Sequence, residues 1–370
     1  MRWMKTLAAS AAALILGVGV ATAGQSIDLN EVGAMLVYSS IQATDASATT
    51  DDVETFVTVT NAMSDGKNIH MSFINGDSDS NKYCYECDWD VYLTGFDTET
   101  LVFTANGQWT NIVNEDAAYA AGSNQNGTFS SRTCQWGEGM LIAVPEDSLG
   151  DPDRDNRLFG DEVVVNYTAG YAYSIPAHSI QSEGSNGNRS FDFGDEYTRF
   201  PRVVASNFLA PTTSNTPGAE VVLFTLDFKR QFPPQTDCSL FGFDANENSF
   251  SNSVIFGCWE RINLCGDLDP EFCHPNLGLD AGGDPHTHGW FSLSCEVDHD
   301  RADNTSETAD GNVHGAIIQR AAGGTVLRKN DLGAPSLANS AAWARLLFQS
   351  VSIGDSGGLT LEDQSTNPLN

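Results

Sequence analysis

Basic residues are scarce in this sequence. Its 370 residues include 18 Lys and Arg, of which only five are Lys, against 49 Asp and Glu, so the formal net charge is −31. Attraction to nucleic acid or to an anionic membrane surface requires clustered positive charge. The chain has no such cluster, and we therefore expect no nucleic-acid partner.

Long apolar runs are absent after the first 23 residues. Those residues combine Arg2 and Lys5, an apolar run from Leu7 to Val20, and the small residues Ala21-Thr22-Ala23. This pattern is typical of a secretory signal peptide, with cleavage before Gly24. The run is shorter than the roughly 20 residues that span a bilayer. We expect a secreted protein, periplasmic, on the cell surface or extracellular, with no membrane insertion after processing.

The sequence also lacks the common catalytic motifs. It has no G-x-S-x-G elbow, H-E-x-x-H helix, P-loop or dinucleotide fingerprint. The segment Gly354-Asp355-Ser356-Gly357-Gly358 is similar to a serine-protease nucleophile loop, but it has no convincing His and Asp context. We interpret it as a turn, and we expect a protein without enzymatic activity.

Helical periodicity is rare, whereas short alternating runs are common. In 291–297 the residues Phe291, Leu293, Cys295 and Val297 share one face, with Ser292, Ser294 and Glu296 opposite, and in 222–228 Val222, Phe224, Leu226 and Phe228 share a face. Clusters of Gly, Asn, Asp and Ser separate such runs. The pattern predicts an all-β protein. The one helix that we predict spans 336–349.

A polar, strand-poor stretch at 182–198 divides the chain after the signal peptide. The two parts, 24–181 and 199–370, each have a length typical of a β-sandwich. We therefore predict two tandem antiparallel β-sandwich domains, Ig-like or jelly-roll-like, joined by a polar linker and stapled by disulfides.

Eight cysteines follow the signal peptide: Cys84, Cys87, Cys134, Cys238, Cys258, Cys265, Cys273 and Cys295. An even number in an exported chain predicts disulfides. Three precede residue 135 and five follow residue 237, so four bridges require one bond between the halves, and otherwise two thiols stay free. The connectivity is open, although Cys265 and Cys273 are placed to close a small loop.

Several segments together resemble a group of uncharacterised, secreted, β-rich proteins of proteobacteria. The segments are Gly33–Tyr38, Glu54–Asn61, Asn68–Phe73, Asp88–Leu93, Phe256–Glu260 and Ala344–Ser350. The resemblance covers most of the chain and implies export and a β-rich fold. The group has no assigned activity, so the resemblance implies no chemistry.

One acidic loop has the spacing of a calcium ligand set. Asp151, Asp153, Asp155 and Glu162 occupy positions 1, 3, 5 and 12 of a twelve-residue segment. Calcium takes six to eight oxygen ligands, which alternate carboxylates and a bidentate Glu supply. The hypothesis is that calcium binds here and stabilises the protein, against a plain solvated loop. Two reserve sites are Asp77/Asp79/Asn81 and Asp298/Asp300/Asp303.

Five of the seven histidines lie between 274 and 314. His286-Thr287-His288 places two imidazoles at a spacing suited to zinc or copper, and His314 follows nearby. A weak transition-metal site at His286, His288 and His314 is therefore a second metal hypothesis, against ordinary polar surface.

These observations lead to one functional expectation and two alternatives. We expect a secreted, non-catalytic cell-surface or extracellular-matrix protein that acts in structure or interaction, by self-association or by binding an extracellular glycan or protein. The first alternative is a polysaccharide-binding protein or glycoside-active enzyme on a β-sandwich scaffold. The second is a secreted metal-binding protein that uses the histidines.

Overall fold

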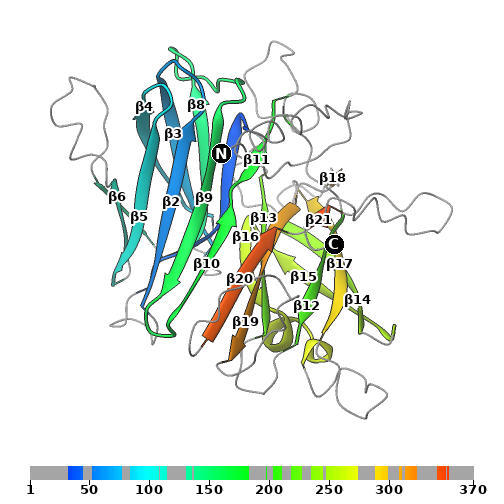
Figure 1. Ribbon diagram of the computed structural model, residues 1–370. Coiled ribbons are helices and arrows are strands. Elements are labelled where there is room, and N and C mark those ends of the chain that lie inside the picture. Colours follow the sequence, from blue (N-terminus) through cyan, green and yellow to red (C-terminus); the bar gives the residue numbers. More distant parts are fainter. Residues whose placement is uncertain are drawn as a thin grey trace, which may run out of the picture.

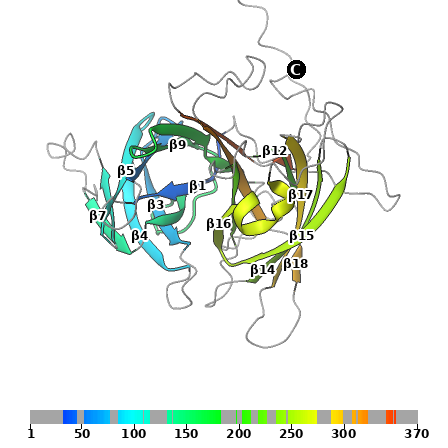
Figure 2. The same ribbon diagram turned by 90° about the horizontal axis from the view of Figure 1, so that it is seen from below.

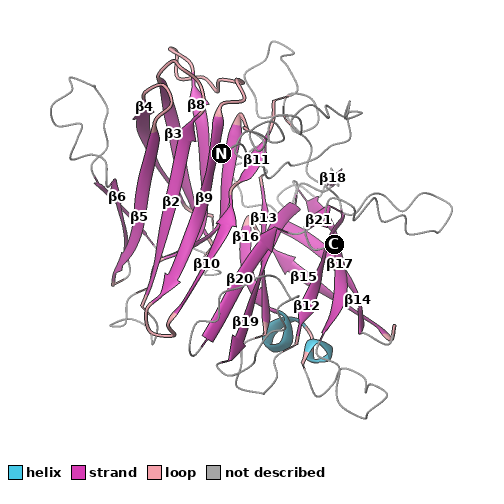
Figure 3. Ribbon diagram, in the orientation of Figure 1, coloured by secondary structure: helices cyan, strands magenta, loops and turns pink. Residues whose placement is uncertain are grey.

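The fold is described from a computed structural model of the chain. The structure describes residues 32–44, 52–76, 84–107, 109–114, 131–135, 137–182, 197, 203–210, 218–226, 235–244, 247–273, 288–298, 308–310, 313–322, 340–346 and 348–349. Most of these residues lie in antiparallel strands, as Figure 3 shows in magenta. The all-β prediction is confirmed.

The first half of the chain forms two sheets (Figure 1). The inner N-sheet has the order β11 (His178–Ile180), β1 (Met35–Gln42), β8 (Glu138–Glu146), β3 (Lys67–Asn75) and β4 (Glu86–Leu93). The outer N-sheet has the order β10 (Tyr171–Pro176), β9 (Leu158–Asn166), β2 (Val53–Asn61), β5 (Thr98–Asn106), β6 (Trp109–Asn114) and β7 (Ser131–Gln135).

The second half forms two more sheets. The inner C-sheet has the order β16 (Trp259–Asn263), β13 (Ala219–Thr225), β19 (Val313–Ala322) and β20 (Ser340–Leu346). The outer C-sheet has the order β15 (Ser249–Phe256), β14 (Gln235–Asp244), β17 (His288–Asp298), β12 (Val203–Leu209) and β21 (Phe348–Gln349), and β18 (Thr308–Asp310) pairs with β17. Two short helical turns, η1 (Leu264–Leu268) and η2 (Pro270–Phe272), follow β16.

The outer sheets alternate as the sequence predicts. In β17, Phe291, Leu293 and Cys295 are buried in the core between the two C-sheets, while Ser292, Ser294 and Glu296 lie on the other face. Successive side chains of a strand point to opposite faces, so one apolar face is enough to hold an outer sheet in place.

The inner sheets are buried on both faces at strands β1 and β13, whereas one face of the edge strand β4 is exposed or half-buried. Every residue of β1 and of β13 is buried. Leu36 and Tyr38 of β1 pack between the two N-sheets, while Met35 and Val37 pack into a third core that also contains Val222 and Phe224 of β13. The two inner sheets therefore pack against each other through this central core. Figure 2 shows the two pairs of sheets lying side by side.

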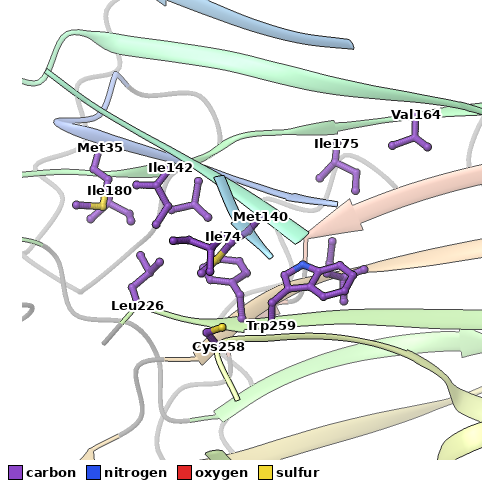
Figure 4. Packing of buried hydrophobic residues seen from close by; sticks show 14 of the residues in the cluster. Met35, Ile74, Met140, Ile142, Val164, Ile175, Ile180, Leu226, Cys258 and Trp259 are labelled. Atoms are coloured by element: carbon purple, nitrogen blue, oxygen red, sulfur yellow. The ribbon is translucent and has the colours of Figure 1, made fainter. Parts of the chain in front are cut away.

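The central core also holds specific polar and steric contacts. Figure 4 shows Met35, Ile142 and Ile180 of the inner N-sheet near Leu226 and Trp259 of the second half. The indole Nε1 of Trp259 donates to the carbonyl of Ser39 at 2.7 Å. Gly76 lies so close beneath the Trp259 ring that an added Cβ would meet it at 1.8 Å. Residues from both halves therefore shape this contact.

All eight cysteines are paired, and the disulfide prediction is confirmed. Cys84–Cys258 joins the two halves, as the odd number of cysteines in each half requires. Cys87–Cys134 links β4 to β7, and Cys238–Cys295 joins the paired strands β14 and β17. Cys265–Cys273 closes the small loop that carries η1 and η2.

The predicted helix at 336–349 is wrong. Residues 340–346 form β20, which pairs antiparallel with β19 from Ala322↔Ser340 to Ala316↔Leu346, and Phe348–Gln349 forms β21. The alanine-rich composition favours a helix, but the unpaired edge of β19 supplies backbone partners and overrides that preference. Most of the predicted linker, residues 183–196, lies outside the described residues. Its ends meet in a bridge between Ser182 and Tyr197.

Candidate functional site

The predicted calcium residues do not come together. Glu162 lies in β9 and is completely buried. Its carboxyl oxygens accept from the backbone N–H of Ser40 at 2.9 and 3.2 Å, and from the Ser39 hydroxyl at 3.4 Å. The pairing of β1 with β8 shifts register between Tyr38 and Ile41. A backbone N–H at such an irregularity lacks its usual partner in the ladder, and Glu162 supplies the acceptor.

Burial changes the acidity of Glu162. Desolvation raises the pKa of its carboxyl to about 8, against the lowering effect of the hydrogen bonds from Ser40 and Ser39. The neighbouring hydroxyl of Tyr173 contacts Ser40 Oγ at 3.1 Å and accepts from Gln42 Nε2 at 2.8 Å. Glu162 therefore belongs to a buried polar network between the strands.

The three aspartates of the same segment lie outside that network, after β8. Asp153 forms an ion pair with Lys67, and Asp155 Oδ2 lies 2.7 Å from Arg157 Nη2. The backbone N–H of Asp151 donates to Asp147 Oδ1 at 3.1 Å. Basic side chains thus contact two of the three carboxylates. Of the reserve sites, all but the backbone of Asp298 lies outside the described residues, and calcium binding stays a prediction.

Of the predicted histidine site, the two described residues, His288 and His314, lie in different sheets. His286 lies outside the described residues, and His288 is exposed at the start of β17. His314 of β19 is buried, and its ring centroid lies 4.6 Å from that of His178 in β11. Burial lowers the pKa of His314 to about 4, and burial together with His314 lowers that of His178 well below its usual value. This pair belongs to the contact between the inner sheets.

An aromatic cluster lies on the outer face of the outer C-sheet. Cys238 and Leu240 of β14 point into the core, so Phe241 and Phe243 lie on the opposite face. The Phe243 ring stacks on Trp290 of β17, with centroids 5.0 Å apart and planes 29° apart, and meets the Phe241 ring edge-on at 4.8 Å. Phe241 keeps 43% of its surface exposed. We call Phe241, Phe243 and Trp290 the aromatic cluster.

Hydroxyl groups surround this cluster. Phe241 is paired with Ser251 of β15 on one side and with Ser292 of β17 on the other. Ser249 faces Phe243, and further along the same face Ser253, Ser239 and Ser294 stand side by side. Two acids, Asp237 and Glu296, stand opposite each other at the far end. The face therefore combines apolar rings with many small donors and acceptors.

A second set of polar residues, on the inner N-sheet, was also not predicted. His70, Asp90 and Glu146 come from β3, β4 and β8, and one potential ligand atom of each lies within 4.8 Å of the other two. In the described part of the chain, no other group of three or more His, Cys, Asp or Glu residues meets this distance criterion. Because these residues are far apart in sequence, spacing does not reveal them. The acidic alternation Asp88-x-Asp90 on a predicted strand was the available signal.

Comparison with known protein families, with curated proteins and with solved structures finds no match to this chain. The resemblance to secreted proteobacterial proteins therefore stays a prediction. Within the described residues, no helix has the length and apolar character needed to cross a membrane.

Proposed function

We propose that this chain is an exported, non-catalytic interaction protein that binds a neutral extracellular polysaccharide through the outer face of its outer C-sheet. The aromatic cluster, set among serines on an exposed sheet face, is the observation that carries the proposal. Export is supported by the signal-peptide pattern of residues 1–23 and by four disulfides, which persist in oxidising compartments.

The chemistry of the face fits a sugar polymer. A pyranose ring has an apolar C–H face that stacks on an aromatic ring, and hydroxyls around its rim that hydrogen-bond with side chains. Phe241 and Trp290 supply ring surface, and Ser251 and Ser292 beside them supply hydroxyls that both donate and accept. The strands of a sheet present these groups on a broad face, which suits an extended chain.

Charge favours a neutral polymer. The net charge of −31 and the acids Asp237 and Glu296 on the same face repel an anionic polysaccharide. Contacts with a neutral glycan do not depend on ion pairs, so we expect binding to change little with salt concentration.

The test is binding of the secreted protein to cellulose, chitin, xylan and mannan, with alginate as the anionic comparison. We expect binding to at least one neutral polymer. The double variant Phe241→Ala/Trp290→Ala should weaken that binding at least tenfold, which corresponds to about 1.4 kcal/mol. Trp109→Ala is the matched control, because Trp109 is exposed to 45% on the outer N-sheet and lies outside the aromatic cluster.

Two results would contradict the proposal. Equal binding by the wild type and the double variant, with circular dichroism unchanged, would show that the aromatic cluster does not bind the polysaccharide. If none of the four neutral polymers binds, the proposal that the ligand is a neutral polysaccharide is wrong. Release of reducing ends during the same incubations would favour the glycoside-active alternative.

A further inference from the structure

One face of the inner N-sheet carries a mixed set of nitrogen and oxygen donors. Ile69 and Met71 of β3 and Val91 of β4 point into the core between the N-sheets. His70 and Asp90, which are paired across these strands, therefore lie on the opposite face. Glu146 of β8 joins them because its strand partner in β3 is Asn68, two residues before His70.

We propose that His70, Asp90 and Glu146 bind a divalent transition metal, zinc in the first place. The site goes beyond the proposed polysaccharide binding and lies on a different sheet from the aromatic cluster. His70 Nδ1 lies 2.9 Å from Asp90 Oδ1 and 3.6 Å from Glu146 Oε1. Two donors bound tetrahedrally to one zinc ion at about 2.0–2.1 Å are separated by about 3.3 Å, so these spacings need only small shifts.

The residues around these three donors have the arrangement of a second coordination shell. The other imidazole nitrogen, His70 Nε2, lies 3.9 Å from Asp88 Oδ1, and Asp88 in turn accepts from the Ser72 hydroxyl at 2.8 Å. A metal-bound histidine commonly donates its remaining N–H to a carboxylate, and Asp88 is the carboxylate placed to accept it once the separation shortens to hydrogen-bond length. Asn68 Nδ2 donates to Glu146 Oε2 at 3.0 Å and leaves Oε1 directed at the imidazole.

The balance of charge favours a cation at this face. Asp88, Asp90 and Glu146 place three carboxylates around one imidazole, and Glu86 adds a fourth carboxylate that shares the Ser72 hydroxyl with Asp88. Among the described residues, no Lys or Arg forms an ion pair with these acids. A divalent ion would relieve the repulsion between carboxylates that the sheet holds close together.

The donor set selects the kind of metal. Calcium takes six to eight oxygen ligands, whereas an imidazole with two carboxylates is a borderline set that suits zinc. Three protein ligands leave a fourth tetrahedral position for water or for a ligand from solution. The ion can reach the site, because the side chains of His70 and Asp90 are 37% and 50% exposed. All three donors come from paired strands, which position side chains more precisely than loops do.

The experiment is calorimetric titration of the full, tag-free secreted protein with zinc chloride, in buffer treated to remove metals. We expect one zinc ion per chain and no competition from millimolar calcium or magnesium. His70→Ala should abolish measurable binding, and Asp88→Asn should weaken it by 10- to 100-fold, as loss of an outer-shell partner does. His288→Ala is the matched control, because His288 is an exposed histidine on another sheet.

Each outcome decides the proposal. Wild-type protein that binds no zinc, or binding that survives His70→Ala, overturns the site. If calcium displaces the bound zinc equally well, the ion is held by carboxylate oxygens alone, and the choice of zinc is wrong. If His70→Ala loses its β-rich circular dichroism, His70→Gln replaces it in the same titration. None of these results depends on polysaccharide binding, which the aromatic cluster variants test separately.

Discussion

Glu162 and the buried histidine pair have opposite effects on stability as pH changes. The pKa of Glu162 is raised to about 8, so the stability that its protonated form contributes is complete below its unfolded value near 4.5 and is lost as pH rises through 8. The pKa of His314 is lowered to about 4, so its contribution is complete above about 6.5 and is lost as pH falls toward 4.

We predict that Glu162→Gln removes the alkaline part of this dependence. The amide keeps an acceptor for the Ser40 N–H and has no charge to bury. The unfolding free energy of the variant relative to wild type should rise by about 2 to 4 kcal/mol between pH 5 and pH 9, since each unit of pKa shift corresponds to about 1.4 kcal/mol. Both proteins contain the same histidines, so the contribution of the histidines to the unfolding free energy cancels in this difference.

Urea unfolding at a series of pH values measures this effect. Glu296→Gln, which removes an exposed carboxylate from β17, serves as the control and should show a flat difference. A flat difference for Glu162→Gln as well would mean that water or a proton donor reaches Glu162 in the folded protein, and the interpretation of its burial would fail.

At the scale of elements, the contact between β3 and β16 depends on one glycine. Gly76 follows β3, and its Cα lies against the Trp259 ring at the start of β16. We predict that Gly76→Ala lowers the unfolding free energy by about 1 to 3 kcal/mol, because the added methyl group overpacks the central core. Gly266→Ala is the matched control, since a Cβ there meets its nearest neighbour at an ordinary 3.5 Å.

A double-mutant cycle with Trp259→Leu checks the cause. If the ring is the obstacle, Gly76→Ala should cost less in the Trp259→Leu background, where a smaller side chain gives room. The same cost in both backgrounds, or an equal loss in Gly76→Ala and Gly266→Ala, would locate the effect in the backbone instead.

How far an element can be predicted from sequence depends on its layer. The serine and apolar residues of β17 alternate, and the sequence predicts both faces correctly. In β13 the pattern indicates one apolar face, yet Val221 and Leu223 are buried as well, because this strand lies between two cores. The spacing of Asp151 and Glu162 suggests one loop, but the strand that begins at Leu158 carries Glu162 into the interior.

The proposed metal site and the aromatic cluster could not be predicted from sequence for a related reason. Their residues meet only through the register of neighbouring strands, such as His70↔Asp90 and Phe243↔Trp290. A local pattern gives the face of a strand, but it does not give the partner strand or the register. The prediction of a helix at 336–349 was wrong for the same reason, because the sequence of β20 does not reveal that the edge of β19 is available for pairing.

At the scale of the molecule, the Cys84–Cys258 bond is the disulfide that joins the two halves. It joins residues 174 positions apart, whereas Cys265–Cys273 joins residues eight positions apart. The chain-entropy relation assigns about 5 kcal/mol to the longer loop and about 2.5 kcal/mol to the shorter one. We predict that Cys84→Ala/Cys258→Ala lowers the unfolding free energy by about 2 to 3 kcal/mol more than Cys265→Ala/Cys273→Ala.

Urea unfolding of both double variants provides the measurement, and neither variant leaves an unpaired thiol. The central core should keep the halves together in the Cys84→Ala/Cys258→Ala protein, so its unfolding should stay a single transition. Equal losses in the two variants would contradict the dependence on loop length. Two separate transitions would show that the central core alone does not couple the halves.

The central core also has a consequence for the order of events in synthesis. The first half leaves the ribosome well before Val222, Phe224 and Trp259 exist, so Met35, Ile142 and Ile180 face water during that interval. The time needed to synthesise the second half therefore sets how long the first half persists with these apolar side chains exposed. A longer delay between the two halves leaves this apolar surface exposed for longer, so we expect more aggregation when synthesis of the second half is slowed.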